Sequence, residues 1–135
     1  MRKLLSINYS AGAFNFAMLL LRLTFGALMM NHGFGKLTHF NEMSSKMPHF
    51  LGMSGTITLA LLVFAEFFCS LFIILGLFTR LACIPLIIAM SYALFSSHHG
   101  DIFKEGEMAT LYLGAYIVLL LLGPGKVSVD GMTGK

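Results

Sequence analysis

Long apolar segments, each near the length of a membrane span, constrain the fold of this chain most. Four can be read, at 14–31, 58–79, 81–97 and 108–123. Each is about 16 to 22 residues long, against the ~20 residues that cross a bilayer core. The segment Leu81 to Ser97 carries no charge, whereas a helix in water needs charged residues on its outward face. The pattern predicts an integral membrane protein.

The composition also favours a membrane protein, and it argues against nucleic acid as a partner. Hydrophobic residues make up 57% of the chain and charged ones 11%, whereas a soluble domain has roughly 25% charged residues. The net charge of +3 comes without a run of lysine or arginine, so nucleic acid is not an expected partner. Cys69 and Cys83 lack the spacing of a dithiol or zinc site and are expected to be buried structural thiols.

We predict an all-α membrane protein, with residues 1–135 forming one antiparallel four-transmembrane-helix bundle. The second and third segments are nearly contiguous, so they should form a tight hairpin. The first loop, 32–56, is too long for a simple turn. Its apolar residues recur every three or four positions, which favours a short interfacial helix on the outer side: Phe40, Met43, Met47, Phe50 and Leu51.

Counts of lysine and arginine in the loops predict the orientation of the chain. One side of the expected bundle holds five such residues and the other holds three, diluted by acidic residues. This bias predicts that both termini lie in the cytoplasm. The same topology puts all five histidines on the outer side: His32, His39, His49, His98 and His99. A bound molecule is therefore expected in the outer half of the bundle.

A single charge interrupts each of the first two apolar segments, Arg22 in one and Glu66 in the other. Because an arginine facing lipid costs at least ~2.5 kcal/mol on insertion scales, Arg22 is expected to point into the bundle. It shares a helical face with mostly small or polar residues: Asn15, Gly26, Met29, Gly33 and, if the helix continues, Lys36. We predict that Arg22 and Glu66 form a buried charge pair, which serves either helix register or a proton or ligand path.

Five side chains of the outer half are candidates for ligand binding: His32, Lys36, His98, Glu107 and Tyr112. Imidazole and carboxylate can ligate zinc, copper or iron, but their spacing here matches no compact motif, so no metal site is predicted. A tyrosine inside a bundle is expected to find a hydrogen-bond partner. The residues alone contain no clear cofactor motif and leave the catalytic residues unknown.

Three stretches, taken in order and with their spacing, resemble the DoxX family. RLTFGALMMNHGFGKL, at 22–37, carries an arginine in the first helix and an HGxxKL turn. Residues 61–90 carry a buried glutamate, a glycine and an arginine at the next turn, and 106–131 end in GPG-x-x-S-x-D. By position, the motif residues are Arg22, His32, Gly33, Lys36, Glu66, Arg80, Glu107 and Asp130.

The resemblance implies a four-helix bundle in the bacterial cytoplasmic membrane. The DoxX family takes its name from a subunit of a thiosulfate:quinone oxidoreductase, and other members have been linked to oxidative-stress complexes. It therefore implies a quinone-linked redox subunit or accessory protein in oxidative-stress or sulfur metabolism. A quinone would be the ligand, and a partner protein would deliver the electrons.

Two other functions stay open at this level. The chain could be a non-catalytic membrane scaffold or assembly subunit, in which the buried charges serve only the fold. It could also conduct small solutes or protons, although the charge-free stretch 81–97 argues against a continuous polar path. The sequence leaves open whether the protein is an enzyme and whether it forms a homo-oligomer.

Overall fold

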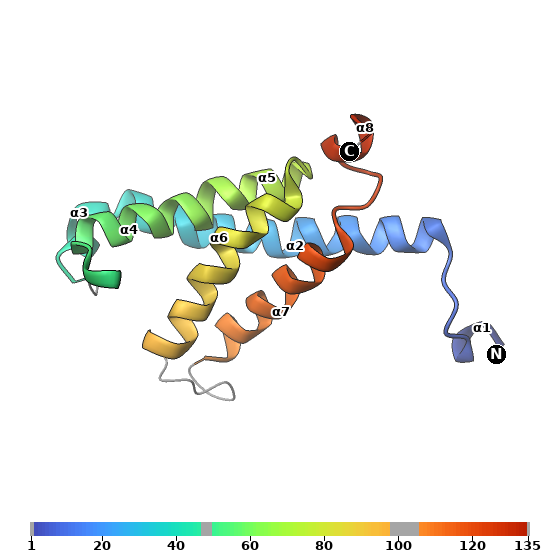
Figure 1. Ribbon diagram of the computed structural model, residues 1–135, viewed down its shortest axis with the longest axis horizontal. Coiled ribbons are helices and arrows are strands. Elements are labelled where there is room, and N and C mark those ends of the chain that lie inside the picture. Colours follow the sequence, from blue (N-terminus) through green and yellow to red (C-terminus); the bar gives the residue numbers. More distant parts are fainter. Residues whose placement is uncertain (1, 47–49, 98–105, 135) are drawn as a thin grey trace.

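A computed structural model describes residues 2–46, 50–97 and 106–134, and every regular element among them is a helix. Figure 1 shows their arrangement. The elements are α1 (Arg2–Leu5), α2 (Ala11–Thr38), α3 (Phe40–Ser44), η1 (Phe50–Gly52), α4 (Gly55–Val63), η2 (Phe64–Cys69), α5 (Ser70–Leu75), α6 (Thr79–Tyr92), η3 (Ala93–Ser97), α7 (Glu107–Leu122) and α8 (Val129–Met132). The expected all-helical class is confirmed over these residues.

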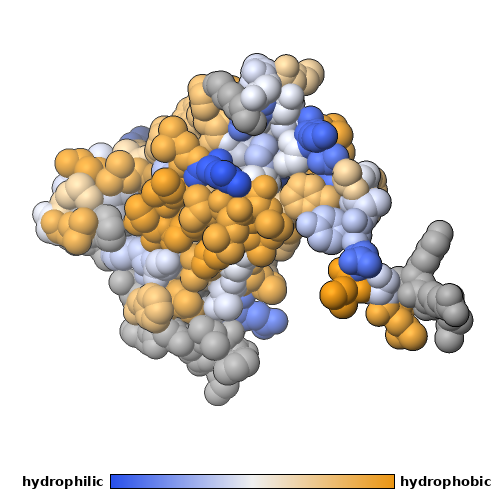
Figure 2. All heavy atoms as spheres, turned by 45° about the vertical axis from the view of Figure 1, so that its right-hand side comes forward, coloured by the Kyte–Doolittle hydropathy of each residue, from blue (hydrophilic) through white to orange (hydrophobic). Residues whose placement is uncertain are grey.

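Two helices are long and apolar enough to cross a membrane. They are α2 and the continuous helix Gly55–Leu75, which is made of α4, η2 and α5. The helices Thr79–Phe95 and Glu107–Leu122 are also apolar but shorter. Figure 2 shows a broad apolar surface interrupted by separate polar groups, and Leu81, Phe95 and Leu121 are each more than 60% exposed. So large an exposed apolar surface suits contact with lipid.

The ends of the helices differ from the segments expected from the sequence. The first expected segment ends at Asn31, whereas α2 continues to Thr38. His32 and Lys36 therefore lie on a helix, whereas the first loop was expected to begin at His32. No proline interrupts this stretch, and the Lys36 side chain forms an ion pair with a neighbouring helix that holds the extra turns in place. The short helix α3 follows, in the loop where a short helix was expected.

The body of the molecule consists of two antiparallel helix pairs. α2 lies against η2 and α5, and α6 lies against α7; α6 also contacts η2 (Figure 1). Both cysteines are free and buried, as predicted. The fully buried side chains that join the two pairs include Leu59, Ile73, Cys83, Leu86, Tyr116 and Leu119. The core is therefore shared by all of the long helices.

The start of α6 is capped by a residue from the far end of the chain. α5 ends at Gly76, whose φ of 70° is left-handed, and Phe78 also has a left-handed φ of 49°. Phe78 offers no side-chain cap to α6. Instead, the carboxylate of Asp130 accepts hydrogen bonds from the backbone N–H groups of Phe78 and Thr79, at 3.0 and 3.1 Å. A carboxylate there also suits the positive end of the helix dipole.

We expect Asp130→Ala to lower the free energy of unfolding by about 2 kcal/mol, because two N–H groups at the start of α6 lose a charged acceptor. Asp130→Asn keeps one acceptor oxygen and should lose less. Thermal unfolding in detergent, followed by circular dichroism, measures both effects. Equal stability of wild type and Asp130→Ala would contradict the capping role.

Candidate functional site

Arg22 is buried, with 2% of its surface exposed, and its guanidinium group donates four hydrogen bonds to backbone carbonyls. Two of the acceptor carbonyls lie in the last turn of α5, and the other two lie in the segment after α7. The bonds run from Nε to Ile73 O (3.0 Å), from Nη2 to Ile74 O (2.9 Å), and from Nη1 to Pro124 O (2.9 Å) and Val127 O (2.7 Å). Arg22 thus ties α2, α5 and the C-terminal segment together.

The predicted pair between Arg22 and Glu66 is wrong, although both residues are buried as expected. Every hydrogen bond of Arg22 among the described residues goes to a carbonyl oxygen, and Glu66 binds Lys36 instead. The reason is the register of the two helices. Gly33, eleven residues after Arg22 on α2, packs directly on Glu66 and Phe67. At 1.5 Å per residue, Arg22 lies about 16 Å further along the axis.

Lys36 and Glu66 form a close ion pair on a distorted stretch of helix. Lys36 Nζ lies 2.6 Å from Glu66 Oε1, and the side chains are 25% and 4% exposed. Glu66 belongs to η2, which is a π-helix. Such single-turn π-helices occur often at functional sites because they change the direction of side chains. The Lys36–Glu66 pair therefore joins α2 to one of the two buried acidic side chains among the described residues, the other being Asp130.

Three buried hydroxyl groups lie in the core, on Ser70, Tyr112 and Tyr116. Ser70 and Tyr116 are neighbours that can bind each other, and Tyr112 has no hydrogen-bond partner within the described part of the chain. Glu66 lies within electrostatic range of both tyrosines, and Ser70 lies beside Tyr116. We call Lys36, Glu66 and these three residues the buried polar cluster. An unpaired buried hydroxyl costs about 1–3 kcal/mol, so the cluster is suited to gain a partner from water or a ligand.

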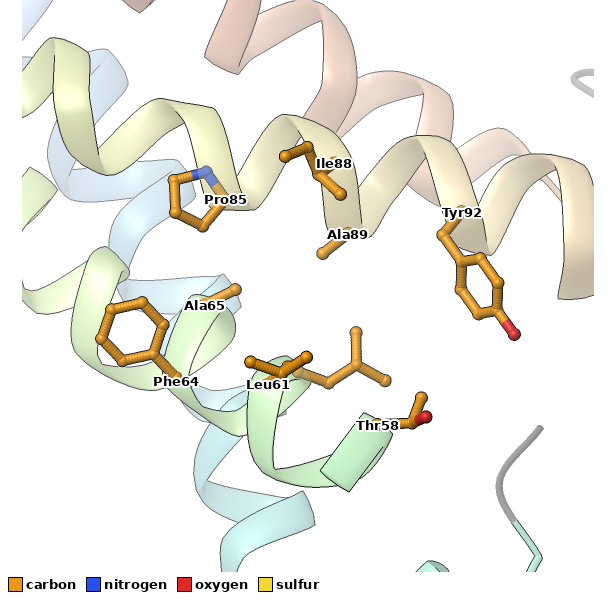
Figure 3. A pocket seen from close by; sticks show the side chains of 9 residues that line it. Thr58, Leu61, Phe64, Ala65, Pro85, Ile88, Ala89 and Tyr92 are labelled. Atoms are coloured by element: carbon orange, nitrogen blue, oxygen red, sulfur yellow. The ribbon is translucent and has the colours of Figure 1, made fainter. Parts of the chain in front are cut away.

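On the α6 side of η2, an apolar groove of about 320 Å³ separates α4 and η2 from α6 (Figure 3). Pro85, Phe64 and Ala65 line one end, and the hydroxyl-bearing side chains Thr58 and Tyr92 lie at the other. Ala65 and Ala89 leave the groove open because their side chains are small. η2 therefore contributes Ala65 to the groove and Glu66 to the buried polar cluster.

The structure brings only some of the predicted ligand-binding residues together. His32 is exposed on α2, and its ring lies edge-on to Tyr112 with centroids 6.0 Å apart. Tyr112 also stacks on Tyr116, at 6.1 Å. Glu107 is exposed at the start of α7, and no hydrogen bond or ion pair among the described residues includes it. His98 lies outside the described residues.

Sequence reasoning missed the groove residues and gave Ser70 and Tyr116 little weight. Tyr116 could have been found, because it is the i+4 neighbour of Tyr112 on α7. Ala65 and Ala89 have no polar signal and become informative only when α4 and α6 are seen side by side. Within residues 2–46, 50–97 and 106–134, no three metal-ligating side chains come together.

Comparison with known proteins supports the resemblance seen in the motifs. Residues 17–99 match the DoxX family. The chain belongs to the DoxX family. An uncharacterized protein of Haemophilus influenzae is 32% identical over 117 residues, which cover 82% of this chain and 85% of that relative. No solved structure matches the chain.

The DoxX match includes the apolar groove but only part of the buried polar cluster, because Tyr112 and Tyr116 lie after residue 99. It contains Arg22, Lys36 and Glu66, and it contains the helices that line the apolar groove. The C-terminal acceptors of Arg22 and the cap residue Asp130 lie after the matched range. Because DoxX proteins are membrane proteins, the apolar surface of this DoxX-family chain is best understood as its contact with lipid.

Proposed function

We propose that this DoxX-family protein spans the bacterial cytoplasmic membrane with four helices, with both termini in the cytoplasm, and serves a quinone-linked redox reaction. Four apolar helical segments support the number of crossings, and the loop charges support the orientation. The chain would act as a subunit or accessory protein in oxidative-stress or sulfur metabolism. A partner protein would deliver electrons, and a second copy of the chain could complete the assembly.

The observation that carries this proposal is the shape and chemistry of the groove between α4, η2 and α6. Its walls are almost entirely apolar, and the side chains of Thr58 and Tyr92 lie at one end (Figure 3), where the Thr58 hydroxyl already donates to Ser54 O at 3.0 Å. A quinone has a planar ring with two carbonyl acceptors and an isoprenoid tail. Binding sites for such ligands combine apolar walls with a few polar groups that orient the ring. The ring would lie near Tyr92 and the tail would extend toward Pro85.

The buried polar cluster would provide protons for the same reaction. A quinone that is reduced to a quinol takes up two electrons and two protons. The electrons come from the partner protein, so this chain needs only to bind the quinone and to exchange protons. Lys36 and Tyr112, with His32 at the exposed edge, carry exchangeable protons beside Glu66. His98 and Glu107 stay candidates for the same outer region.

Filling the groove should prevent quinone binding. Ala89→Phe puts a ring into the floor of the groove and should weaken binding of a short-chain ubiquinone about tenfold or more, because the lost contact area is worth at least 1.4 kcal/mol. Leu111→Phe adds an equal ring at an exposed position of α7 that is not in the groove wall, and should bind as wild type does. Calorimetric titration in detergent measures all three proteins.

If Ala89→Phe does not fold, quinone binding can be measured with Tyr92→Phe instead. This variant removes only one hydroxyl group and should therefore fold. A wild-type protein that binds no quinone, and that carries none in extracted lipid, would contradict the redox function. In that case the scaffold or assembly role becomes the better explanation, since Arg22 and Asp130 join the helices through backbone groups and need no ligand to do so. Conduction of protons or small solutes would then be tested by flux into vesicles.

A further inference from the structure

A second hollow lies at the opposite end of the molecule from His32 and Lys36. Its volume is about 700 Å³, and its walls come from the first turns of α2, the first residues of α6 and the segment between α7 and α8. The backbone N–H of Lys126 donates to Asn15 Oδ1 at 2.9 Å, which holds that segment against α2. Figure 1 shows the segment passing from the end of α7 across α2 to α8.

Within the described part of the chain, the charged groups in the wall of the hollow that have no opposite charge beside them are mainly positive. Arg80 and Lys126 are exposed in its wall. Arg80 donates one long bond, 3.3 Å, to Leu121 O, and no ion pair among the described residues involves Lys126. The acidic wall residue, Asp130, already accepts two backbone N–H groups and lies in the field of Arg22. The uncompensated charge is therefore cationic.

Neutral hydrogen-bond donors add to these two cations. Thr79 lines the hollow and is fully buried, and its hydroxyl oxygen has no partner within the described residues. Asn15 uses its amide oxygen to accept from Lys126, so its amide N–H groups are left to donate. Two cations and two neutral donors around one hollow match the acceptor oxygens of a phosphate group.

The rim of the hollow is apolar and exposed, which distinguishes a lipid from a soluble anion. Leu81 and Leu122 are both wall residues, and they are 66% and 51% exposed. They belong to the apolar helices α6 and α7. A phosphate in the hollow would thus leave attached acyl chains beside apolar helix surfaces. Basic pockets between transmembrane helices at the cytoplasmic surface are where acidic lipid head groups bind.

We propose that this second hollow, which lies on the cytoplasmic side in the proposed orientation, binds the phosphate head group of an anionic phospholipid, with Arg80 and Lys126 as the cationic contacts. The site is separate from the groove of the proposed quinone reaction, and it stands whether or not that reaction occurs. Its position between α2, α6 and the C-terminal segment means that a bound lipid would join the same three parts that Arg22 and Asp130 hold together.

To test this, the purified protein is mixed with equal amounts of phosphatidylglycerol and phosphatidylcholine in mixed micelles. Native mass spectrometry then measures which lipid the protein retains. Wild type should retain phosphatidylglycerol in preference, and the double variant Arg80→Gln with Lys126→Gln should lose the preference, at about fivefold for each cation. Lys46→Gln removes an exposed cation in the turn after α3, away from the hollow, and should leave the preference unchanged.

Two results would overturn the proposal. One is a preference that does not depend specifically on Arg80 and Lys126. An unchanged preference in the double variant would mean that the lipid binds elsewhere, and an equal loss in Lys46→Gln would mean that lipid follows the net charge of the protein. The other is full displacement of phosphatidylglycerol by millimolar inorganic phosphate, which would make the hollow a site for free phosphate. Lys126→Gln alone should show a partial loss and serves if the double variant does not fold.

Discussion

The substitution Arg22→Leu should lower the free energy of unfolding by about 4 kcal/mol or more, because it leaves four carbonyl oxygens without their donor. These acceptors lie at the end of α5 and in the segment after α7, so both parts lose their connection to α2. Unfolding in detergent by increasing dodecyl sulfate, followed by circular dichroism, measures the loss.

Arg22→Lys separates the role of charge from that of geometry. A lysine keeps the positive charge, but its single nitrogen does not reproduce the fork of a guanidinium that reaches four acceptors at once. We expect a stability between those of wild type and Arg22→Leu. If Arg22→Lys is as stable as wild type, charge alone is sufficient, and the four-bond arrangement is not what holds these segments.

An exchange of charges tests the corrected pairing directly. Arg22→Glu combined with Glu66→Arg should be at least as unstable as either single variant, because the two residues have different partners. Lys36→Glu combined with Glu66→Lys should recover much of the stability lost in each single variant, because these two side chains bind each other at 2.6 Å. Rescue by the first exchange and not by the second would contradict the observed pairs.

Gly33→Ala should lower the free energy of unfolding by about 3 kcal/mol, because α2 and η2 leave no space for a methyl group there. A Cβ at this position would lie 2.6 Å from the backbone N of Phe67 and 2.7 Å from the carbonyl C of Glu66. Neither backbone atom can turn away as a flexible side chain could. The helices must separate, which also lengthens the Lys36–Glu66 pair.

Gly35→Ala is the matched control on the same turn of α2. A Cβ there meets nothing within 4 Å, so the change should be neutral or slightly stabilising through helix propensity. Dodecyl sulfate titrations of both variants give the comparison. Equal stability of Gly33→Ala and Gly35→Ala would mean that α2 does not pack on η2 as closely as described.

The helical face of Arg22 was predictable from the sequence, but its partners were not. Met18, Arg22, Gly26, Met29 and Gly33 are the buried residues of α2, and four of them lie on the face that the periodicity indicated. The acceptors of Arg22 are backbone carbonyls, which every residue carries. The side chains of Ile73 and Val127 give no sign that their carbonyl groups are the acceptors. The sequence pattern therefore indicated Glu66, an opposite charge, as the partner of Arg22.

The partner of Glu66 was missed for a different reason. By hydropathy the first apolar segment ends at Asn31, which puts Arg22 near its middle, just as Glu66 lies near the middle of the second segment. The helix itself continues to Thr38, and the close fit at Gly33 sets the register of α2 against η2. The π-helical turn at Glu66, which contacts both α2 and α6, was not predicted from the sequence.

The sequence by itself determined the apolar helices, the buried face of α2 and the membership in the DoxX family, because hydropathy, periodicity and motif spacing are local properties of the chain. Only the tertiary structure decided that Arg22 binds carbonyls, that Lys36 binds Glu66, and that Asp130 caps α6 from the far end of the chain. Those contacts depend on helix register. Register is decided by packing at glycines and by backbone groups that all residues share.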